Sequence, residues 1–318
     1  MLKVDDSAKN YLEKRIDDEK CATFPGTVLL DLVSYCNLKC SMCTHKDMKR
    51  KPGIMSWELY KKCIDEIAEK RPDCRVWLVA YGDPFILKDM PARIKYAKDK
   101  GLLDTVLNTN GTLMNYENAK ACVQAGLDFI YVGIDATTQE VYEQLRVSVS
   151  PSQHQLKDTI DNVMAYKRAL DEFGNGSQKL FVQFVVMNVN EHQKDDFISF
   201  WNERGVNVKT RPMVSWNNRV EAPNLKQQID RLPCKWIYTD LLIGYDGKTA
   251  FCTCDLEFEN YVAEMGESSI EEIWNTVYSK YRTIHSEKKW NELPDFCQSC
   301  LDWQSGYAIY DLPDGEKH

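Results

Sequence analysis

Short apolar runs alternate with longer amphipathic segments between residues 27 and 213. The runs are rich in branched and aromatic residues, which is typical of buried strands: 27–33, 74–81, 102–109, 127–134, 179–187 and 206–213. The segments between them place apolar residues at helical spacing: Ser56–Glu69, Met90–Lys100, Tyr116–Ala125, Asp158–Phe173 and Lys194–Arg204. Six such units predict an α/β domain whose parallel strands all end at one rim.

The alternation stops after Met213. We therefore expect an N-terminal extension over residues 1–26, a barrel-type domain over 27–213, a linker over 214–233, a small domain over 234–310 and a tail over 311–318. The small domain has two short strand-like runs around an Asp-Gly turn and one helix-like segment, Ser269–Ile284. A hydrophobic core of this size usually needs a bound metal or another cross-link to be stable.

Composition and charge exclude several classes of protein. The 318 residues are 43% hydrophobic and carry a net charge of −8, which fits a globular protein and argues against nucleic acid or anionic membrane as a partner. No apolar run approaches the length of a membrane span, and the first 20 residues do not resemble a secretory leader. We expect a cytoplasmic protein.

Twelve cysteines are unusual in such a chain, because disulfides are rare in the cytosol. Four of them stand alone and are expected to be packed in the core: Cys21, Cys63, Cys74 and Cys122. The other eight form two groups, one directly after the first strand and one in the small domain. Two groups of thiols predict two metal sites.

The first group is Cys36, Cys40 and Cys43, with the spacing C-x3-C-x2-C. Three thiolates in one loop can hold three irons of a [4Fe–4S] cluster and leave the fourth iron open. A zinc site with His45 as its fourth ligand is an alternative, as is a set of buried thiols.

The second group contains four thiols from three segments: Cys234, Cys252, Cys297 and Cys300. Four converging thiolates fit either zinc or a fully ligated cluster. Cys254, two residues after Cys252, is a packed thiol, a replacement ligand or a hydrogen-atom donor to a substrate radical.

The strand ends around the first group resemble the radical S-adenosylmethionine (SAM) superfamily. Gly82-Asp83-Pro84 is similar to the Gly-Glu-Pro motif of that family, residues 108–111 to its Thr-Asn-Gly segment, and residues 133–136 to its Ser-Ile-Asp-Gly segment. The resemblance implies a partial (β/α)6 TIM-like barrel in which the three cysteines hold a [4Fe–4S] cluster and the open iron binds SAM.

The resemblance also implies which residues line the SAM pocket. They are Met42, where the family usually has an aromatic residue, Gly82, Asp83, Asn108, Asn110, Asp135, Arg146 and Gln183. Arg146 closes the run EVYEQLR, which is similar to a helix of the family, and in some relatives an arginine of this region pairs with the SAM carboxylate. The alternative is an exposed helix arginine paired with Tyr142 or Glu143. Gln183 either faces the barrel interior or pairs with a neighbouring strand.

The late cysteines resemble those of the twitch domain, a shortened form of the SPASM domain. That resemblance implies one auxiliary [4Fe–4S] cluster held by Cys234, Cys252, Cys297 and Cys300 in a small α+β domain. Their spacing is also similar to that in a family member that oxidises an aminocyclitol in butirosin biosynthesis.

Together these resemblances imply an enzyme that cleaves SAM reductively to a 5′-deoxyadenosyl radical, which removes hydrogen from a C–H bond. The implied substrate is a small carbohydrate-like molecule, such as a sugar, sugar nucleotide or aminocyclitol, and the outcome is oxidation or epimerisation. A flavodoxin or ferredoxin would supply electrons. The alternatives are a peptide- or protein-modifying maturase and a non-catalytic iron–sulfur electron carrier. Residues placed near the seam between the domains are candidates for substrate contact: Arg211, Trp216, Asn217 and Arg219.

Overall fold

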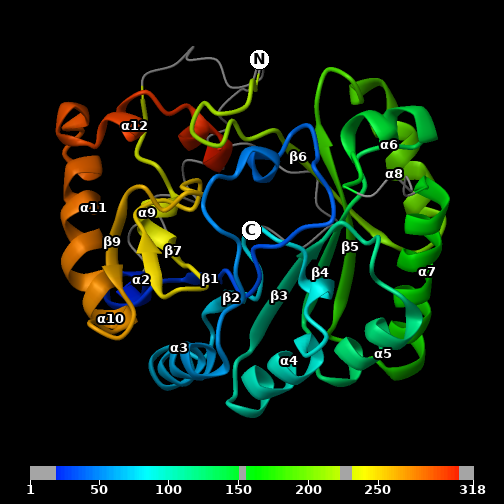
Figure 1. Ribbon diagram of the computed structural model, residues 1–318, viewed down its shortest axis with the longest axis horizontal. Helices are drawn as coiled ribbons and strands as arrows, with labels where there is room; N and C mark the ends of the chain where they lie inside the picture. Colours follow the sequence, from blue (N-terminus) through cyan, green and yellow to red (C-terminus); the bar gives the residue numbers. More distant parts are fainter. Residues whose placement is uncertain (1–18, 150–154, 223–230, 308–318) are drawn as a thin grey trace.

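The computed structural model describes residues 19–149, 155–222 and 231–307, and one nine-stranded sheet organises them (Figure 1). Its strand order is β6-β5-β4-β3-β2-β1-β7-β8-β9. Strands β1 to β6 are parallel and follow the chain in order: β1 (Thr27–Leu30), β2 (Arg75–Trp77), β3 (Asp104–Thr109), β4 (Phe129–Gly133), β5 (Lys179–Val186) and β6 (Asn207–Pro212). The partial six-stranded barrel expected from the sequence is confirmed.

Helices connect these strands and cover the outer face of the barrel (Figure 1). They are α3 (Trp57–Lys70), α4 (Met90–Asp99), α5 (Tyr116–Gln124), α6 (Gln139–Leu145), α7 (Leu156–Phe173) and α8 (Lys194–Asn202). Each buries an apolar stripe; on α3 this stripe consists of Tyr60, Cys63, Ile64 and Ile67. Five of these helices lie within two residues of the amphipathic segments that the sequence predicted.

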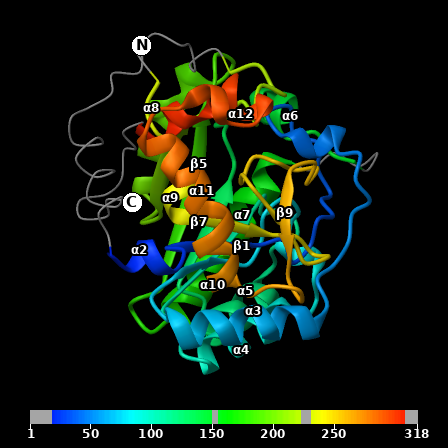
Figure 2. The same cartoon turned by 90° about the vertical axis from the view of Figure 1, so that its left-hand side faces the viewer.

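The C-terminal part continues the barrel sheet. Strand β7 (Asp240–Ile243) pairs in parallel with β1, and β8 (Lys248–Ala250) and β9 (Tyr261–Glu264) follow in antiparallel register. Helices α2 (Glu19–Thr23), α9 (Trp236–Thr239), α10 (Ile270–Ile273), α11 (Ser279–Ser286) and α12 (Asp295–Gln298) complete this side of the molecule (Figure 2). A π-helical segment over Trp274–Tyr278 joins α10 to α11, in the region where the sequence predicted one helix.

An aromatic stack fills the barrel interior. The rings of Trp77 and Tyr131 stack with their centroids 5.6 Å apart, and Tyr131 and Phe181 follow at 5.1 Å. Successive inward positions along a strand are two residues apart, so the next layer contains Gly133 and Gln183. The interior therefore changes from an aromatic floor to a polar layer near the strand ends.

The four isolated cysteines lie in the core, as predicted. Cys21 is 4% exposed, and Cys63, Cys74 and Cys122 are fully buried. Burial raises the pKa of Cys63 and that of Cys122 to about 12, so these thiols stay protonated and behave as apolar side chains. Across the described ranges, we find no helix with the length and apolar character needed to cross a membrane.

Candidate active site

The loop that carries the first three cysteines follows β1 and is fixed by backbone hydrogen bonds. The amide of Lys39 donates a hydrogen bond to the carbonyl of Val147 at 2.7 Å. The amide of Ser41 donates one to the carbonyl of Leu145 at 3.0 Å. These contacts attach the loop to the chain directly after α6. Contacts with a distant part of the chain therefore fix the shape of the loop that carries the eight-residue motif Cys36–Cys43.

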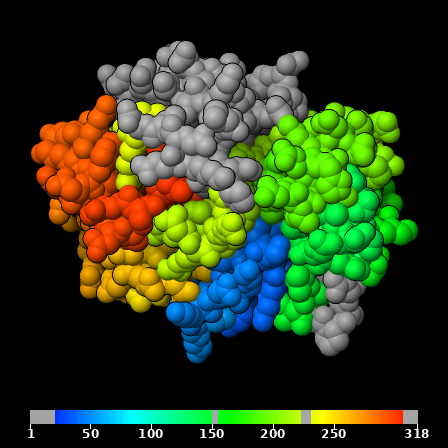
Figure 3. Space-filling model, turned by 90° about the horizontal axis from the view of Figure 1, so that it is seen from above, coloured from blue at the N-terminus to red at the C-terminus, as the bar shows by residue number. Residues whose placement is uncertain are grey.

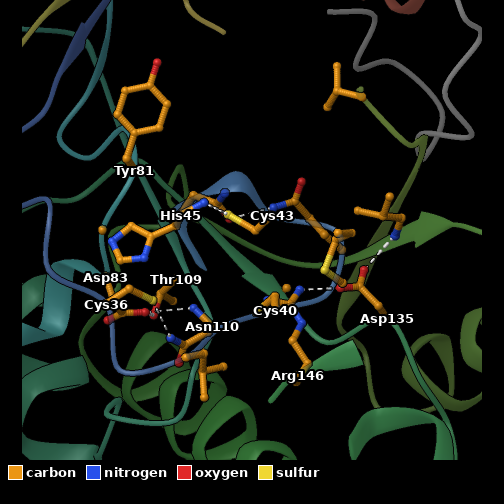
Figure 4. A pocket seen from close by; sticks show the side chains of 18 of the residues that line it. Cys36, Cys40, Cys43, His45, Tyr81, Asp83, Thr109, Asn110, Asp135 and Arg146 are labelled. Carbon is orange, nitrogen blue, oxygen red and sulfur yellow. Dashed lines mark hydrogen bonds and ion pairs between the residues drawn. The ribbon is translucent and has the colours of Figure 1, made fainter. Parts of the chain in front are cut away.

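Each of the three thiols faces one pocket and has an N–H donor beside it (Figure 4). The amide of His45 donates to the Cys43 sulfur at 3.4 Å, Nη1 of Arg146 to that of Cys40 at 3.6 Å, and Nδ2 of Asn110 to that of Cys36 at 3.8 Å. Such donors stabilise thiolate ligands of an iron–sulfur cluster.

Burial raises the pKa of Cys36 to about 12 and that of Cys43 to about 11. These thiols therefore keep their protons until bound metal takes the place of the protons, because a buried thiolate needs a compensating positive charge. The donor set is accordingly suited to a bound cluster and poorly suited to free thiolates.

A single zinc ion fits this loop less well. Among the described residues, no group of three or more His, Cys, Asp or Glu side chains is placed to hold one metal ion. His45, the proposed fourth zinc ligand, has its Nε2 2.8 Å from the carbonyl oxygen of Ser34.

Asp83 connects the ends of two barrel strands. Its Oδ2 accepts hydrogen bonds from Oγ1 of Thr109 at 2.8 Å and from the amide of Asn110 at 2.9 Å, and its Oδ1 accepts from the amide of Phe85 at 3.0 Å. The side chain is almost fully buried, and burial raises its pKa. Asp83 therefore holds the β2 and β3 ends together and lines the pocket at the same time.

Gly82, next to Asp83, permits the close approach of β2 to the cysteine loop. A Cβ atom at this position would lie 2.1 Å from the carbonyl oxygen of Val33 and 2.5 Å from that of Tyr35. Neither oxygen belongs to a flexible side chain that could move aside, so glycine is required here.

The polar layer above the aromatic floor comes from β3 and β5. Nε2 of Gln183 donates to Oδ1 of Asn108 at 2.7 Å, so Gln183 faces the interior rather than only pairing with a neighbouring strand. Asn110 also donates to Oδ1 of Asn37 at 2.9 Å, which links the β3 end to the cysteine loop. All of these residues except Asn37 line the pocket.

The Arg146 side chain is only 12% exposed, which corrects the alternative of an exposed helix arginine. Its guanidinium forms an ion pair with Asp135, a residue eleven positions earlier, rather than with Tyr142 or Glu143. Burial alone would lower the pKa of Arg146, but Asp135, Cys40 and Tyr142 together raise it. Asp135 is itself fully buried, with φ of 64°, and its Oδ1 accepts from the amide of Val185 at 2.7 Å.

Two aromatic rings that the sequence did not assign as a pair form one wall of the pocket. The centroids of Tyr81 and Trp216 are 6.3 Å apart, and the indole Nε1 of Trp216 donates to the carbonyl of Met42 at 3.1 Å. Met42 and Arg211 line the same pocket. Tyr81 could have been suspected from its place before Gly82, but no local pattern indicates its contact with residue 216.

Two of the proposed substrate residues are absent from the described lining of this pocket. Arg219 is paired with Glu259 at 3.1 Å and lies 3.9 Å from Glu257. The amide of Asn217 donates to Asp302 at 2.6 Å. Residues 216–219 form a turn that hydrogen bonds to Asp302 hold against the C-terminal part, so this described portion of the expected linker is structured.

The four late cysteines converge in a second site. Burial raises the pKa of Cys234 well above its usual value, and the neighbouring thiols of Cys252, Cys297 and Cys300 raise it further. N–H donors again reach the sulfurs: the amide of Asp302 lies 3.4 Å from Cys300, and Nη2 of Arg231 lies 3.5 Å from Cys297. This donor set also fits an iron–sulfur cluster.

Cys254 belongs to the second site rather than to the first pocket. Its amide donates to the Cys252 sulfur at 3.4 Å, and a hydrogen bond with Cys252 is the largest cause that raises its pKa, followed by burial. It is 4% exposed and is not among the residues that line the pocket at the first cysteine group.

Comparisons with known families match both parts of the chain. The model of the radical SAM superfamily matches residues 31–197, which is more than half of the chain. The model of SPASM, an iron–sulfur cluster-binding domain, matches residues 234–301. The two matches cover the two cysteine groups.

Curated relatives have different activities. The chain is 25% identical over 182 residues to the tungsten-containing aldehyde ferredoxin oxidoreductase cofactor-modifying protein of Pyrococcus furiosus, covering 56% of this chain and 49% of that protein. It is 36% identical over 110 residues to the Fe-coproporphyrin III synthase of Methanosarcina barkeri, covering 34% and 27%. The chain thus spans about half or less of the length of these relatives.

Solved structures share the fold. BtrN in complex with AdoMet and 2-DOIA superposes with a TM-score of 0.58 at 14% identity, covering 86% of this chain and 92% of BtrN. SuiB of Streptococcus suis, bound to its precursor peptide SuiA, gives a TM-score of 0.66 at 12% identity, covering 92% and 74%. The fold is therefore shared by BtrN, an enzyme of butirosin biosynthesis, and by a protein that binds a peptide.

Proposed function

The chain belongs to the radical SAM superfamily, and from this premise we propose that it abstracts hydrogen from a C–H bond of a small, oxygen-rich molecule and oxidises it. Its cofactors are a [4Fe–4S] cluster, SAM and an auxiliary iron–sulfur cluster. One observation supports the catalytic part above all others: three thiols with N–H donors line a single pocket together with polar strand ends.

When bound, the first cluster and SAM supply a 5′-deoxyadenosyl radical for hydrogen abstraction, and the auxiliary cluster supplies an electron acceptor. The chain's own residues provide the surroundings. Cys36, Cys40 and Cys43 would hold the first cluster, and Cys234, Cys252, Cys297 and Cys300 the auxiliary one. Asp83, Asn108, Asn110 and Gln183 form the polar layer over the aromatic floor, which limits the depth of the pocket and orients a bound molecule.

Arg211 supports an oxygen-rich substrate. Its side chain lines the pocket, and among the described residues no hydrogen bond or ion pair engages its guanidinium. Arg146, by contrast, is already paired with Asp135. The charge of Arg211 acts on the nearby Cys43 thiol, but a guanidinium that no hydrogen bond or ion pair engages suits hydroxyl, carboxylate or phosphate oxygens. We therefore propose a sugar, sugar nucleotide or related polyol as the substrate class.

The position of Cys254 favours oxidation over epimerisation. Epimerisation requires a hydrogen-atom donor that faces the substrate radical, and Cys254 was the candidate. Its thiol instead contacts Cys252 at the auxiliary site and is not part of the pocket lining. We propose that Cys254 supports the auxiliary site and that the product is an oxidised substrate.

Peptide modification is a second candidate, because an apolar groove adjoins the pocket. The groove shares Met42 and Met213 with the pocket and is also lined by Leu145, Val186 and Val189, among others. An extended chain could lie in such a groove while one residue reaches the pocket. The superposition on peptide-bound SuiB is consistent with this candidate but shows the fold alone.

Anaerobic reconstitution with iron and sulfide, followed by SAM and a chemical reductant, tests the proposal. Reduced protein should form 5′-deoxyadenosine, and the C36A/C40A/C43A variant should not. Deuterated sugar nucleotides, aminocyclitols and short peptides should then be compared for deuterium transfer into 5′-deoxyadenosine. With the unlabelled substrates, a product two mass units lighter supports oxidation, and an unchanged mass with inverted configuration supports epimerisation. Deuterium transfer from peptides alone supports the second candidate. If no SAM is cleaved, the catalytic proposal is wrong.

A further inference from the structure

Three consecutive residues between β6 and the auxiliary site have a left-handed backbone. The φ angles of Trp216, Asn217 and Asn218 are 51°, 60° and 61°. Asparagine tolerates this region, but a bulky residue such as tryptophan rarely adopts it. A turn of this kind persists only where its surroundings hold it, so the contacts that fix it are informative.

Asp302 holds this turn. Its side chain is fully buried, and its Oδ1 and Oδ2 accept hydrogen bonds from the amide of Ser215 at 2.5 Å and from the amide of Asn217 at 2.6 Å. These two amides flank Trp216. A carboxylate that accepts from both sides of one residue fixes that residue's backbone.

The same residue is attached to the auxiliary site. The backbone amide of Asp302 donates to the sulfur of Cys300 at 3.4 Å. Nδ2 of Asn218 donates to the carbonyl of Ser299 at 2.9 Å, which gives the turn a second attachment to the same loop. In Figure 3 the yellow-green surface of the segment after β6 borders the red surface of this C-terminal region.

The other side of the turn reaches the pocket of the first cluster. Trp216 lines that pocket, and its indole Nε1 donates to the carbonyl of Met42, the residue before Cys43. Tyr81, the neighbouring ring of this wall, donates its hydroxyl to the carbonyl of Thr253, which lies between Cys252 and Cys254. The Tyr81 ring is therefore anchored directly to a loop of the auxiliary site, and Trp216 is attached to that site through the backbone amides on either side of it.

We propose that the auxiliary site sets the shape of the SAM pocket, and that Asp302 is the positioning residue that transmits this effect through Trp216. A filled auxiliary site fixes Cys300 and Asp302, which hold Trp216 against Met42. Loss of the auxiliary cluster, or of the Asp302 carboxylate, releases the wall and weakens SAM binding at an intact first cluster. By linkage, SAM binding in turn stabilises the auxiliary site.

This inference depends on the two clusters and SAM but not on the proposed substrate or outcome. Wild-type protein that binds SAM without cleaving it would refute the proposed function and leave this inference open to test. A D302N variant that binds SAM as the wild type does would refute this inference alone.

The test compares D302N with D295N in reconstituted protein. Asp295 is exposed and precedes Cys297 by two residues, as Asp302 follows Cys300 by two, so D295N removes the same charge near the same loop. We expect D302N to keep its iron and to bind SAM at least fivefold more weakly, with an altered electron paramagnetic resonance spectrum of the SAM-bound first cluster. D295N should behave as the wild type. A SAM dissociation constant for D302N within twofold of the wild-type value would overturn the proposal.

The W216F variant shows whether Asp302 acts through Trp216. W216F keeps a ring in the wall but loses the hydrogen bond to Met42. If the proposal is correct, the D302N/W216F double variant binds SAM as weakly as the single variant with the lower SAM affinity, and no more weakly. Both changes then break the same series of contacts. Effects that multiply would show that Asp302 acts elsewhere and would contradict the proposal.

If D302N also loses auxiliary iron, C300A provides the reference. C300A should itself weaken SAM binding, and adding D302N to C300A should weaken it no further. A further fivefold loss in the double variant, or a C300A variant with wild-type affinity, would refute the coupling.

Discussion

The guanidinium of Arg146 lies between the carboxylate of Asp135 and the thiol of Cys40. It pairs with Asp135, and its Nη1 is 3.6 Å from the Cys40 sulfur. Through this contact the end of β4 fixes Cys40, one of the three thiols proposed to hold the first cluster. A buried pair of this kind costs free energy of desolvation, so its value lies in fixing geometry as much as in stability.

Gly133 leaves room for this arginine, which gives the first prediction. A Cβ at residue 133 would lie 2.3 Å from Nη2 of Arg146. The guanidinium cannot move aside freely because Asp135 holds it, so we expect G133A to lower the free energy of unfolding by about 1 to 3 kcal/mol. Chemical denaturation of the reconstituted protein measures this. In an R146K background the same substitution should be nearly neutral; an equal loss there would show that another contact is responsible.

Asp83 should matter more for stability than any single partner of its carboxylate. D83N replaces one of two acceptor oxygens with a donor and leaves buried N–H groups unpaired, which costs about 1 to 3 kcal/mol for each such group. T109V removes one of the three hydrogen bonds to the carboxylate and also the bond that the Thr109 hydroxyl accepts from the amide of Gly111 at 3.0 Å, and should cost about 1 to 2 kcal/mol. Thermal unfolding and SAM affinity of the two variants provide the comparison. If T109V is as damaging as D83N, the carboxylate does not connect the two strands as described.

Iron content should separate the two cysteine groups. Reconstituted wild type should hold about eight irons per chain, and both C36A/C40A/C43A and C297A/C300A should hold about four, because each [4Fe–4S] cluster contains four. Metal and sulfide analysis would measure this, with electron paramagnetic resonance to identify the remaining cluster.

C254A should retain about eight irons, since the Cys254 thiol contacts a ligand rather than replacing one. The C122A variant is the matched control, because Cys122 is a buried thiol far from both groups in sequence and fully packed in the core. A C254A protein with about four irons would identify Cys254 as a ligand.

Arg211 should determine substrate affinity. Removal of its charge in R211M should raise the KM for a sugar nucleotide or other oxygen-rich substrate by about tenfold or more, since a charge-assisted hydrogen bond contributes about 1.5 to 3 kcal/mol. R211K should lose less, because it keeps the charge without the planar donor geometry. Steady-state kinetics with 5′-deoxyadenosine and product measured together give the result. An unchanged KM in R211M would place the substrate away from β6.

Several features followed from the sequence because they depend on local spacing. The alternation of buried runs and amphipathic segments predicted six strands and five of the six helices that connect and follow them, since the period of a strand or helix is a property of the chain itself. Cys36, Cys40 and Cys43 lie in one loop, so their proximity needed no tertiary information. The isolated cysteines were also assigned correctly to the core.

Only the tertiary structure decided the contacts between distant segments. Nothing local indicates that β7 pairs with β1, that Trp77, Tyr131 and Phe181 stack into a floor, or that Arg146 pairs with Asp135. The Asp302 carboxylate reaches amides 85 and 87 residues away. Such partners depend on how the parallel strands and their loops converge in space. At Cys254, the orientation of one side chain decides whether the thiol faces the pocket or the neighbouring auxiliary site. The sequence by itself determined the barrel and the two groups of metal-binding cysteines, because both depend on local spacing. The packing of the chain decided which residues surround the pocket and how the two cysteine groups are connected.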